Sequence, residues 1–149
     1  MKIPFLPLLI KQIIRCVFYA VIPPHTEIGK NVLFINNTLG VVLSQRCIIR
    51  NNVVINIHVT MGRRRGYWRS RLVGHDEESD GGGVPMIGNN VYIGGGARLL
   101  GRIRIGDNAI IGANAVVLTD VPANATAVGV PARIILKKPN SKSSSTYNG

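Results

Sequence analysis

Residues 87–122 read IGNNVY-IGGGAR-LLGRIR-IGDNAI-IGANAV-VLTDVP, which is six consecutive groups of six residues. The first residue of each group is Ile, Leu or Val, and the fifth is Val, Ala or Ile. Neither the period of a helix nor the alternation of a strand produces this pattern, so it is a true repeat. It predicts an all-β fold, a parallel β-helix in which each group supplies one short strand and one corner and three groups complete a coil.

The same pattern extends towards the N-terminus, with one break in its frame. A group starts at Phe34, and the next begins nine residues later instead of six, so we place three extra residues around 39–42. Because three groups complete one coil, the group at Phe34 should lie beneath the group at Ile55. His58 is then expected to stack directly on Asn37, about one strand spacing away.

The composition fits a narrow aliphatic core and an anionic partner. The 149 residues make one domain by length, and 46% hydrophobic but only 5% aromatic residues suit a core of Ile, Val, Leu and Ala. The net charge of +11 fits an anionic cofactor, an acidic glycan or the anionic inner leaflet of a membrane. We do not expect nucleic acid as a partner, because the basic residues lack interleaved aromatics. Cys16 and Cys47 are predicted to be reduced core thiols.

The first 21 residues are apolar, with Lys11 and Arg15 inserted, and predict a short amphipathic N-terminal helix. They resemble neither a secretory signal nor a spanning helix. The helix is expected to cap the open end of the β-helix and to pack at a subunit contact. The alternative is an interfacial helix that touches anionic lipid. We therefore expect a cytoplasmic protein, either free or peripheral at the inner membrane face.

The repeat fills a predicted β-helix domain over residues 22–135, which one long protruding loop interrupts. This loop, residues 62–86, does not follow the repeat and is basic in its first half and acidic in its second. It is expected to bridge to a neighbouring subunit through Tyr67 and Trp68, and the alternative is a mobile surface loop. The residues 136–149 are rich in Ser, Lys and Asn and predict a disordered tail.

The run from Val84 to Ile135, with its closing GVPARI, resembles the hexapeptide-repeat acetyltransferases. It is most similar to the serine acetyltransferases and to related enzymes that O-acetylate surface polysaccharides, and the similarity covers about residues 22–135. The resemblance implies a left-handed β-helix, a homotrimer, and acetyl-CoA as acyl donor in a groove between subunits. No metal is implied. A zinc enzyme on this fold would need three converging imidazoles, which His58 and His75 do not supply.

The resemblance also implies which residues bind the cofactor. Gly95, Gly96 and Ala97 occupy the family's first small-residue contact, and Ala113 occupies the second. Missing side chains let a thin thioester arm approach the main chain, although tight corners require small residues as well. Arg133 matches the family's basic residue near the cofactor phosphates.

The departures from the family bear on the acceptor. Serine acetyltransferases carry an Asp-His pair where this chain has Asn36-Asn37, and a second His at the place of Val84. They also carry a large helical N-terminal domain, whereas about 21 residues precede the coils here. The acceptor is therefore expected to be a sugar hydroxyl in capsule or lipopolysaccharide biosynthesis. The alternatives are a serine O-acetyltransferase and a catalytically inactive β-helix scaffold.

Acyl transfer to a hydroxyl calls for a general base with a pKa near neutrality, and His is the usual residue. His58 and His75 are the two candidates, while His25 is expected to lie at the surface of the entry turn. A site without a His base is left open. Asn37 is expected to hold or orient the acceptor or the base.

Overall fold

The computed structural model describes residues 12–13, 17, 19–64 and 83–136. Most of the predicted N-terminal helix, the outer part of the predicted loop and the predicted tail lie outside these residues, and so does His75. In the described part of the chain, no helix has the length and apolar character needed to cross a membrane.

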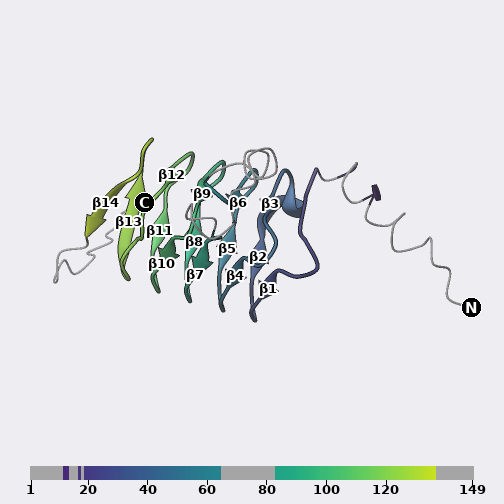
Figure 1. Ribbon diagram of the computed structural model, residues 1–149, viewed down its shortest axis with the longest axis horizontal. Coiled ribbons are helices and arrows are strands. Elements are labelled where there is room, and N and C mark those ends of the chain that lie inside the picture. Colours follow the sequence, from purple (N-terminus) through teal and green to yellow (C-terminus); the bar gives the residue numbers. More distant parts are fainter. Residues whose placement is uncertain (1–11, 14–16, 18, 65–82, 137–149) are drawn as a thin grey trace, which may run out of the picture.

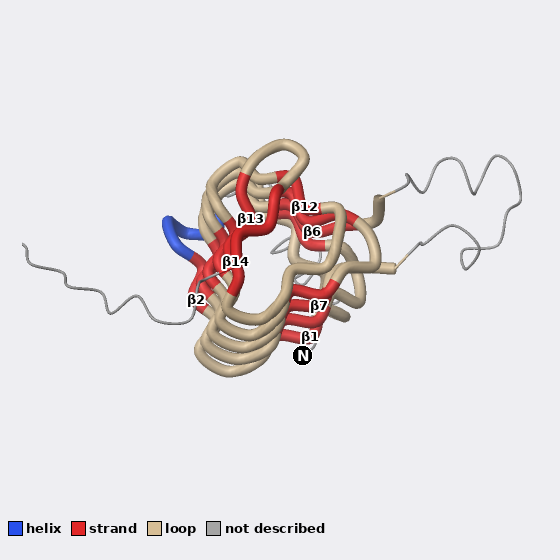
Figure 2. Tube along the Cα trace, turned by 90° about the vertical axis from the view of Figure 1, so that its left-hand side faces the viewer, coloured by secondary structure: helices blue, strands red, loops and turns tan. Residues whose placement is uncertain are grey.

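The described residues form a three-sided stack of short parallel strands, seen from the side in Figure 1 and along its axis in Figure 2. The β1 sheet has the order β1-β4-β7-β10, the β2 sheet has the order β14-β13-β11-β8-β5-β2, and the β3 sheet has the order β12-β9-β6-β3. The strands are β1 Glu27–Ile28, β2 Leu33–Phe34, β3 Val42–Leu43, β4 Ile48–Ile49, β5 Val54–Ile55, β6 Thr60–Gly62, β7 Met86–Ile87, β8 Tyr92–Ile93, β9 Arg98–Leu100, β10 Arg104–Ile105, β11 Ile110–Ile111, β12 Val116–Val117, β13 Ala125–Val128 and β14 Arg133–Leu136.

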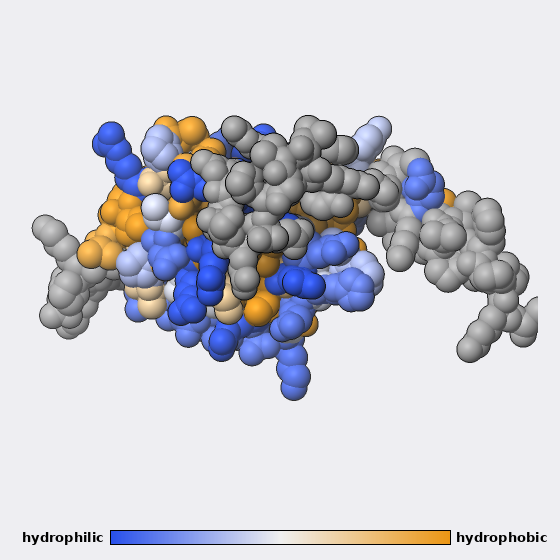
Figure 3. Space-filling model, in the orientation of Figure 1, coloured by the Kyte–Doolittle hydropathy of each residue, from blue (hydrophilic) through white to orange (hydrophobic). Residues whose placement is uncertain are grey.

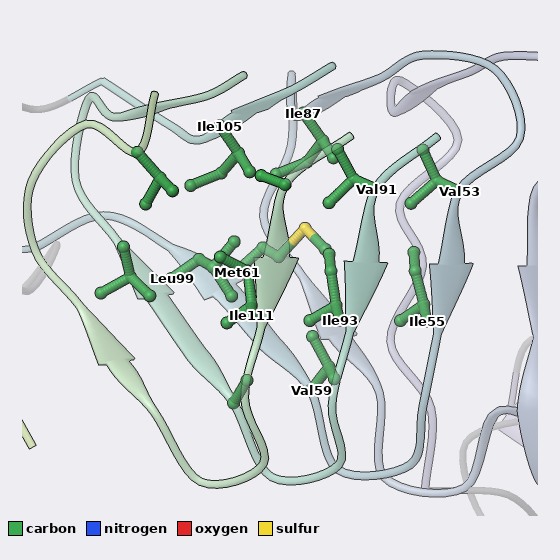
Figure 4. Packing of buried hydrophobic residues seen from close by; sticks show 14 of the residues in the cluster. Val53, Ile55, Val59, Met61, Ile87, Val91, Ile93, Leu99, Ile105 and Ile111 are labelled. Atoms are coloured by element: carbon green, nitrogen blue, oxygen red, sulfur yellow. The ribbon is translucent and has the colours of Figure 1, made fainter. Parts of the chain in front are cut away.

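The register confirms that three groups of six residues complete one coil. Phe34 pairs with Ile55, Ile55 with Ile93, and Ile93 with Ile111. From the group at Leu43 onward, the first residues, Ile55, Ile93 and Ile111 among them, are buried, and their side chains stack inside the coil (Figure 4). The fifth residues, such as Val53 and Ala97, fill the space next to them. A column of aliphatic side chains along the axis therefore holds the coils together.

At the corners that flank the β2 sheet, the chain turns through a residue with a left-handed backbone, and Asn is the commonest choice there among the described residues. Corner 1, which joins the β1 sheet to the β2 sheet, uses Asn at this place in every coil. The five asparagines form a ladder in which each side-chain amide donates to the side-chain oxygen of the next coil. The four bonds measure 3.0–3.1 Å and join Asn31 to Asn52, Asn52 to Asn90, Asn90 to Asn108, and Asn108 to Asn124. Asn tolerates this backbone better than other residues with a Cβ atom. The Asn residues therefore both allow the turn and link neighbouring coils by hydrogen bonds.

The extra residues of the broken frame lie earlier than predicted. They lie within a four-residue 3-10 helix, η1 (Ile35–Thr38), in which Asn36, Asn37 and Thr38 all have positive φ. The chain is back in register at Leu39, whose carbonyl accepts the N–H of His58 at 2.8 Å. The prediction that His58 stacks directly on Asn37 is therefore wrong, because the excursion lifts Asn37 out of the coil before the corner. The residues beneath His58 are Leu39 and Gly40.

An antiparallel strand closes the C-terminal end of the stack. β14 pairs antiparallel with β13, while the other strand pairs of the described residues are parallel. Val128, Ile134, Ile135 and Leu136 are exposed here, and apolar side chains gather at this end of the molecule (Figure 3). The parallel repeat ends at this hairpin.

Candidate functional site

Four of the predicted site residues, His58, Gly95, Gly96 and Ala113, lie at corner 2, which joins the β2 sheet to the β3 sheet. Its turn residues in successive coils are Leu39-Gly40, Ile57-His58, Gly95-Gly96 and Ala113-Asn114. Backbone hydrogen bonds fix this order: His58 N–H donates to Leu39 O at 2.8 Å, Gly96 N–H to Ile57 O at 2.9 Å, and Asn114 N–H to Gly95 O at 2.8 Å. Successive coils are about 4.8 Å apart. His58, Gly95 and Ala113, which are far apart in sequence, therefore lie in one column.

His58 occupies a corner position that Asn or Gly fills at the other described levels of corners 1 and 2. Its φ is 56°, and its side chain is exposed. The imidazole lies over Gly40, where an added Cβ atom would be 2.7 Å from His58 Cε1 and closer still to Nδ1. Gly40 also has a φ of 66°, which suits Gly. Because Gly40 has no side chain, the His58 ring can occupy the space next to its Cα atom.

On the other side of His58, the corner residue of the next coil is also a glycine. Gly96 lies one coil further on, with a φ of 73°. An Asn side chain at this level would lean towards the preceding coil, as the Asn114 side chain does over Gly96. At the level of Gly96 no side chain leans over His58. The ring is thus flanked by two glycines along the corner.

The two corners differ in how the backbone N–H groups of their turns are satisfied. At corner 1, the turn residues Asn51, Asn89 and Asp107 each accept, through side-chain Oδ1, an N–H from the preceding coil. The three donors are Lys30 at 2.8 Å, Asn51 at 3.2 Å and Asn89 at 2.7 Å. The equivalent residues of corner 2 are Ile57, Gly95 and Ala113, which carry no side-chain oxygen. Within the described residues, the N–H groups of these three make no hydrogen bond. Corner 2 therefore presents a row of unpaired backbone donors.

The remaining predicted contacts lie at the ends of this row or face away from it. Arg133 is exposed on β14 and pairs with Val128, whose side chain lies against Gly112 at the outermost regular coil of corner 2. Ala97 has an exposed fraction of 0%, so its methyl group faces the core. Asn37 is exposed in η1, just before Gly40. The column thus runs from η1 and His58 at one end to Arg133 at the other.

Acidic groups are scarce around this column. The described residues contain the carboxylates Glu27, Asp107 and Asp120, and the register places none of them on corner 2. No group of three His, Cys, Asp or Glu side chains that could hold a metal occurs in the same part of the chain. Among the described residues, the polar groups that corner 2 and η1 offer are the His58 imidazole, the Asn amides and the backbone.

Cys47 is the second chemically reactive side chain of the described coils, and it lies inside them. It is a free cysteine with an exposed fraction of 0%. Burial raises the pKa of its thiol from 9.0 to about 11, against a smaller lowering by a backbone hydrogen bond at Ser44. A thiol with this pKa stays protonated at neutral pH and acts as a core residue.

Comparison with known proteins gives a consistent result. Residues 85–119 match the family described as bacterial transferase hexapeptide (six repeats). The serine acetyltransferase of Staphylococcus aureus (strain Mu50) is 42% identical over 126 residues, which cover 85% of this chain and 53% of that protein. The chain is a hexapeptide-repeat protein similar to the serine acetyltransferases. It spans about half the length of the curated relatives it matches.

Solved structures agree with this relationship. A soybean serine acetyltransferase in complex with serine superimposes with a TM-score of 0.70 at 42% identity, covering 87% of this chain and 48% of that one. A serine acetyltransferase from Brucella abortus strain S19 in complex with coenzyme A gives 0.68 at 33% identity, covering 85% and 46%. The likeness to these structures confirms the predicted left-handed parallel β-helix.

These comparisons correct the expected acceptor. The sequence predicts a sugar hydroxyl of a capsule or lipopolysaccharide precursor from three departures: Asn36-Asn37 at the place of the Asp-His pair, Val84 at the place of the second His, and the short segment before the coils. The matched relatives and solved structures are serine acetyltransferases instead, so that expectation is wrong.

Sequence reasoning also missed two groups of corner 2. The position of Gly40 beneath His58 does not follow from the sequence prediction, which puts the extra residues at 39–42, whereas the structure has them within 35–38. The unpaired N–H of Ile57 is a backbone group, so the identity of residue 57 alone does not reveal it. It could have been found by comparing the turn residues of the two corners, since oxygen-bearing side chains fill one set and not the other.

Proposed function

We propose that this chain catalyses the acetyl-CoA-dependent O-acetylation of serine. The observation that carries the proposal is the alignment of His58, Gly95 and Ala113 on successive coils of corner 2. Two structures to which the chain is similar are a serine complex and a coenzyme A complex, which supports both substrates. Bound acetyl-CoA supplies the acetyl group as a thioester.

The donor side of the site is the row from Ile57 to Arg133. The unpaired N–H groups of Gly95 and Ala113 suit the amide carbonyls of an extended arm, and small side chains at both positions let the arm approach. Three coil steps separate His58 from the level of Val128, which is about 14 Å at one strand spacing per coil. Arg133 at that end carries the charge that favours phosphate.

The acceptor side lies around η1 and Gly40. The exposed amides of Asn36 and Asn37 precede Gly40, over which the His58 imidazole lies. These amides can donate hydrogen bonds to a carboxylate and accept them from an ammonium group, as binding of serine requires. His58 accepts the hydroxyl proton, because no other titratable side chain of the described residues lies on this corner. In this scheme, His58 takes the role of the His in the family's Asp-His pair, although it lies one coil further along the β-helix than that His.

A homotrimer is part of the same proposal. The outward residues of the β2 sheet form an almost wholly apolar stripe: Leu33, Val54, Tyr92, Ile110, Thr126 and Ile135. Leu33, Tyr92 and Ile135 are 57%, 44% and 55% exposed. An exposed apolar stripe of this length is typical of a subunit contact. A contact along the β2 sheet would place a neighbouring subunit beside corner 2.

The decisive experiment measures release of free coenzyme A from acetyl-CoA by the purified chain. Serine, threonine, a set of free sugars and water alone serve as acceptors. Serine-dependent release with formation of O-acetylserine is expected. Calorimetry with coenzyme A separates the competing outcomes: binding without serine-dependent release refutes the acceptor, and absence of both binding and release supports an inactive scaffold.

A further inference from the structure

We propose that the backbone N–H of Ile57 is the oxyanion donor for acetyl transfer. The inference rests on the proposed function, and it assigns a catalytic group beyond the imidazole of His58. Ile57 is the turn residue immediately before His58, and its N–H makes no hydrogen bond within the described residues.

The N–H of Ile57 is unpaired because of the residue above it. At corner 1, an equivalent N–H points towards the next coil and meets a side-chain oxygen, as Lys30 N–H does with Asn51 Oδ1 at 2.8 Å. Asn51 N–H does the same with Asn89 Oδ1 at 3.2 Å. At corner 2, the residue in the place of Asn51 and Asn89 is Gly95. With no side chain there, the Ile57 N–H is left available to a bound carbonyl oxygen.

The position suits the chemistry, because donor and base come from adjacent residues and point to opposite sides. The His58 ring lies on the side of Gly40, where η1 leads towards the acceptor. By the geometry of corner 1, the Ile57 N–H points to the side of Gly95, where the thioester would lie. A hydroxyl that approaches from one side can therefore attack a carbonyl held from the other.

The reaction balances with these two groups. The hydroxyl oxygen forms a bond to the carbonyl carbon, and its proton passes to the His58 imidazole. Negative charge moves onto the carbonyl oxygen, where the Ile57 N–H stabilises it. The carbon–sulfur bond then breaks, and the imidazolium returns the proton to the leaving thiolate. Donors placed where charge develops are commonly among the largest contributors to acyl transfer.

Gly95 offers a matched test, because an added Cβ atom there meets only ordinary contacts, at 3.6 Å from Ile57. Gly95→Asn recreates the arrangement of corner 1 and supplies an oxygen that captures the Ile57 N–H. Gly95→Leu adds a side chain of nearly the same shape without that oxygen. Both variants add a side chain of similar size on the donor side, and only Asn carries an oxygen that can accept the Ile57 N–H.

We expect kcat of Gly95→Asn to be on the order of 10²-fold below that of Gly95→Leu, as for loss of one oxyanion donor. The two variants should bind coenzyme A with similar Kd. Asn89→Leu is the control on corner 1, since it frees the N–H of Asn51 and should lower stability without changing kcat. Equal kcat values for the two Gly95 variants, with the Ile57 amide slow to exchange in Gly95→Asn, would overturn the proposal.

A second measurement separates this inference from the proposed function. If the wild-type chain cleaves no thioester, the proposed activity fails. Addition of acetyl-CoA should still shift the Ile57 amide resonance of the wild-type chain, and not that of Gly95→Asn. A shift of this kind supports the N–H as a carbonyl donor, and its absence from the wild-type chain refutes it.

Discussion

The imidazole of His58 lies directly over Gly40, so closely that an added Cβ atom would be 2.7 Å from Cε1. Both residues have left-handed backbones, with φ of 56° and 66°. The ring is therefore held at a corner of the coil by the absence of a side chain one coil earlier. Two substitutions separate the effect of this packing from the strain of the backbone.

Gly40→Ala should displace the His58 ring and lower kcat strongly. The left-handed backbone alone should cost about 1–2 kcal/mol of stability. Gly101→Ala is the control, because Gly101 has a φ of 96° and its added Cβ would meet only the exposed side chain of Arg64. Thermal denaturation should show similar losses for the two variants. An equal loss of kcat in both would mean that the His58 contact has no catalytic effect.

His58→Asn should abolish base catalysis while keeping the fold. Corner 1 shows that Asn suits this backbone, with φ values of 54–60° for the five ladder asparagines. A loss of about 10²–10⁴ in kcat is expected for removal of a general base. Circular dichroism and the Kd for coenzyme A should stay unchanged. Full activity in this variant would remove His58 as the base and leave His75 or a site without a His base.

Asn90 tests the ladder of corner 1. Its amide donates to Asn108 and its oxygen accepts from Asn52, at 3.1 and 3.0 Å. Asn90→Gly keeps the left-handed backbone but loses both bonds, which should cost about 1–3 kcal/mol. Asn90→Ala should cost about 1–2 kcal/mol more, because Ala strains the same backbone. Chemical denaturation measures both, and equal stability of the two variants would contradict the role of backbone strain.

Cys47 should make stability depend on alkaline pH. Burial raises its pKa from 9.0 to about 11 in the folded chain, so the folded state retains a proton that the unfolded state loses. The resulting stability is fully present below pH 9 and is lost as the pH rises towards 11. Cys47→Val removes the titrating group, so its denaturation midpoint should fall less over that interval. Parallel curves for the two proteins would show that the thiol does not contribute.

Tyr92→Lys tests the apolar stripe of the β2 sheet as a subunit contact. Tyr92 is 44% exposed at the centre of the stripe, between Val54 and Ile110. A charge there should shift the mass measured by light scattering from trimer to monomer. Arg98→Glu on the outer face of the β3 sheet is the control and should leave the mass unchanged. A wild-type chain that is already monomeric would refute the trimer.

The periodic part of the fold follows from the sequence because every group of six residues needs an aliphatic side chain at the same position. Ile87, Ile93 and Ile105 all fill the coil interior, and the pairing of Phe34 with Ile55 follows by counting. The break in the frame could not be placed by counting, since three extra residues restore the frame equally well at 35–38 or at 39–42. Only the coordinates distinguish the two, through the hydrogen bond from His58 to Leu39.

The candidate site was predictable in its residues but not in its contacts. Gly95, Ala113 and His58 were identified from sequence, and the register brings them together because they share one place in the coil. Gly40 beneath the ring and the unpaired N–H of Ile57 required the geometry of the corner. Both depend on side chains that are missing, which a search for reactive residue types does not detect.

The regular coils also fix the distance between the two ends of corner 2. Three whole coils separate His58 from the level of Val128, which pairs with Arg133, and the groups of six residues set the height of each coil. Deleting one complete coil between them would preserve the core and the corner columns, because every residue would still find an equivalent neighbour. It would nevertheless shorten the distance between the proposed base, His58, and the proposed phosphate contact, Arg133, by about 4.8 Å. Under the proposed function, the number of repeats between these two residues therefore sets the length of acyl donor that fits.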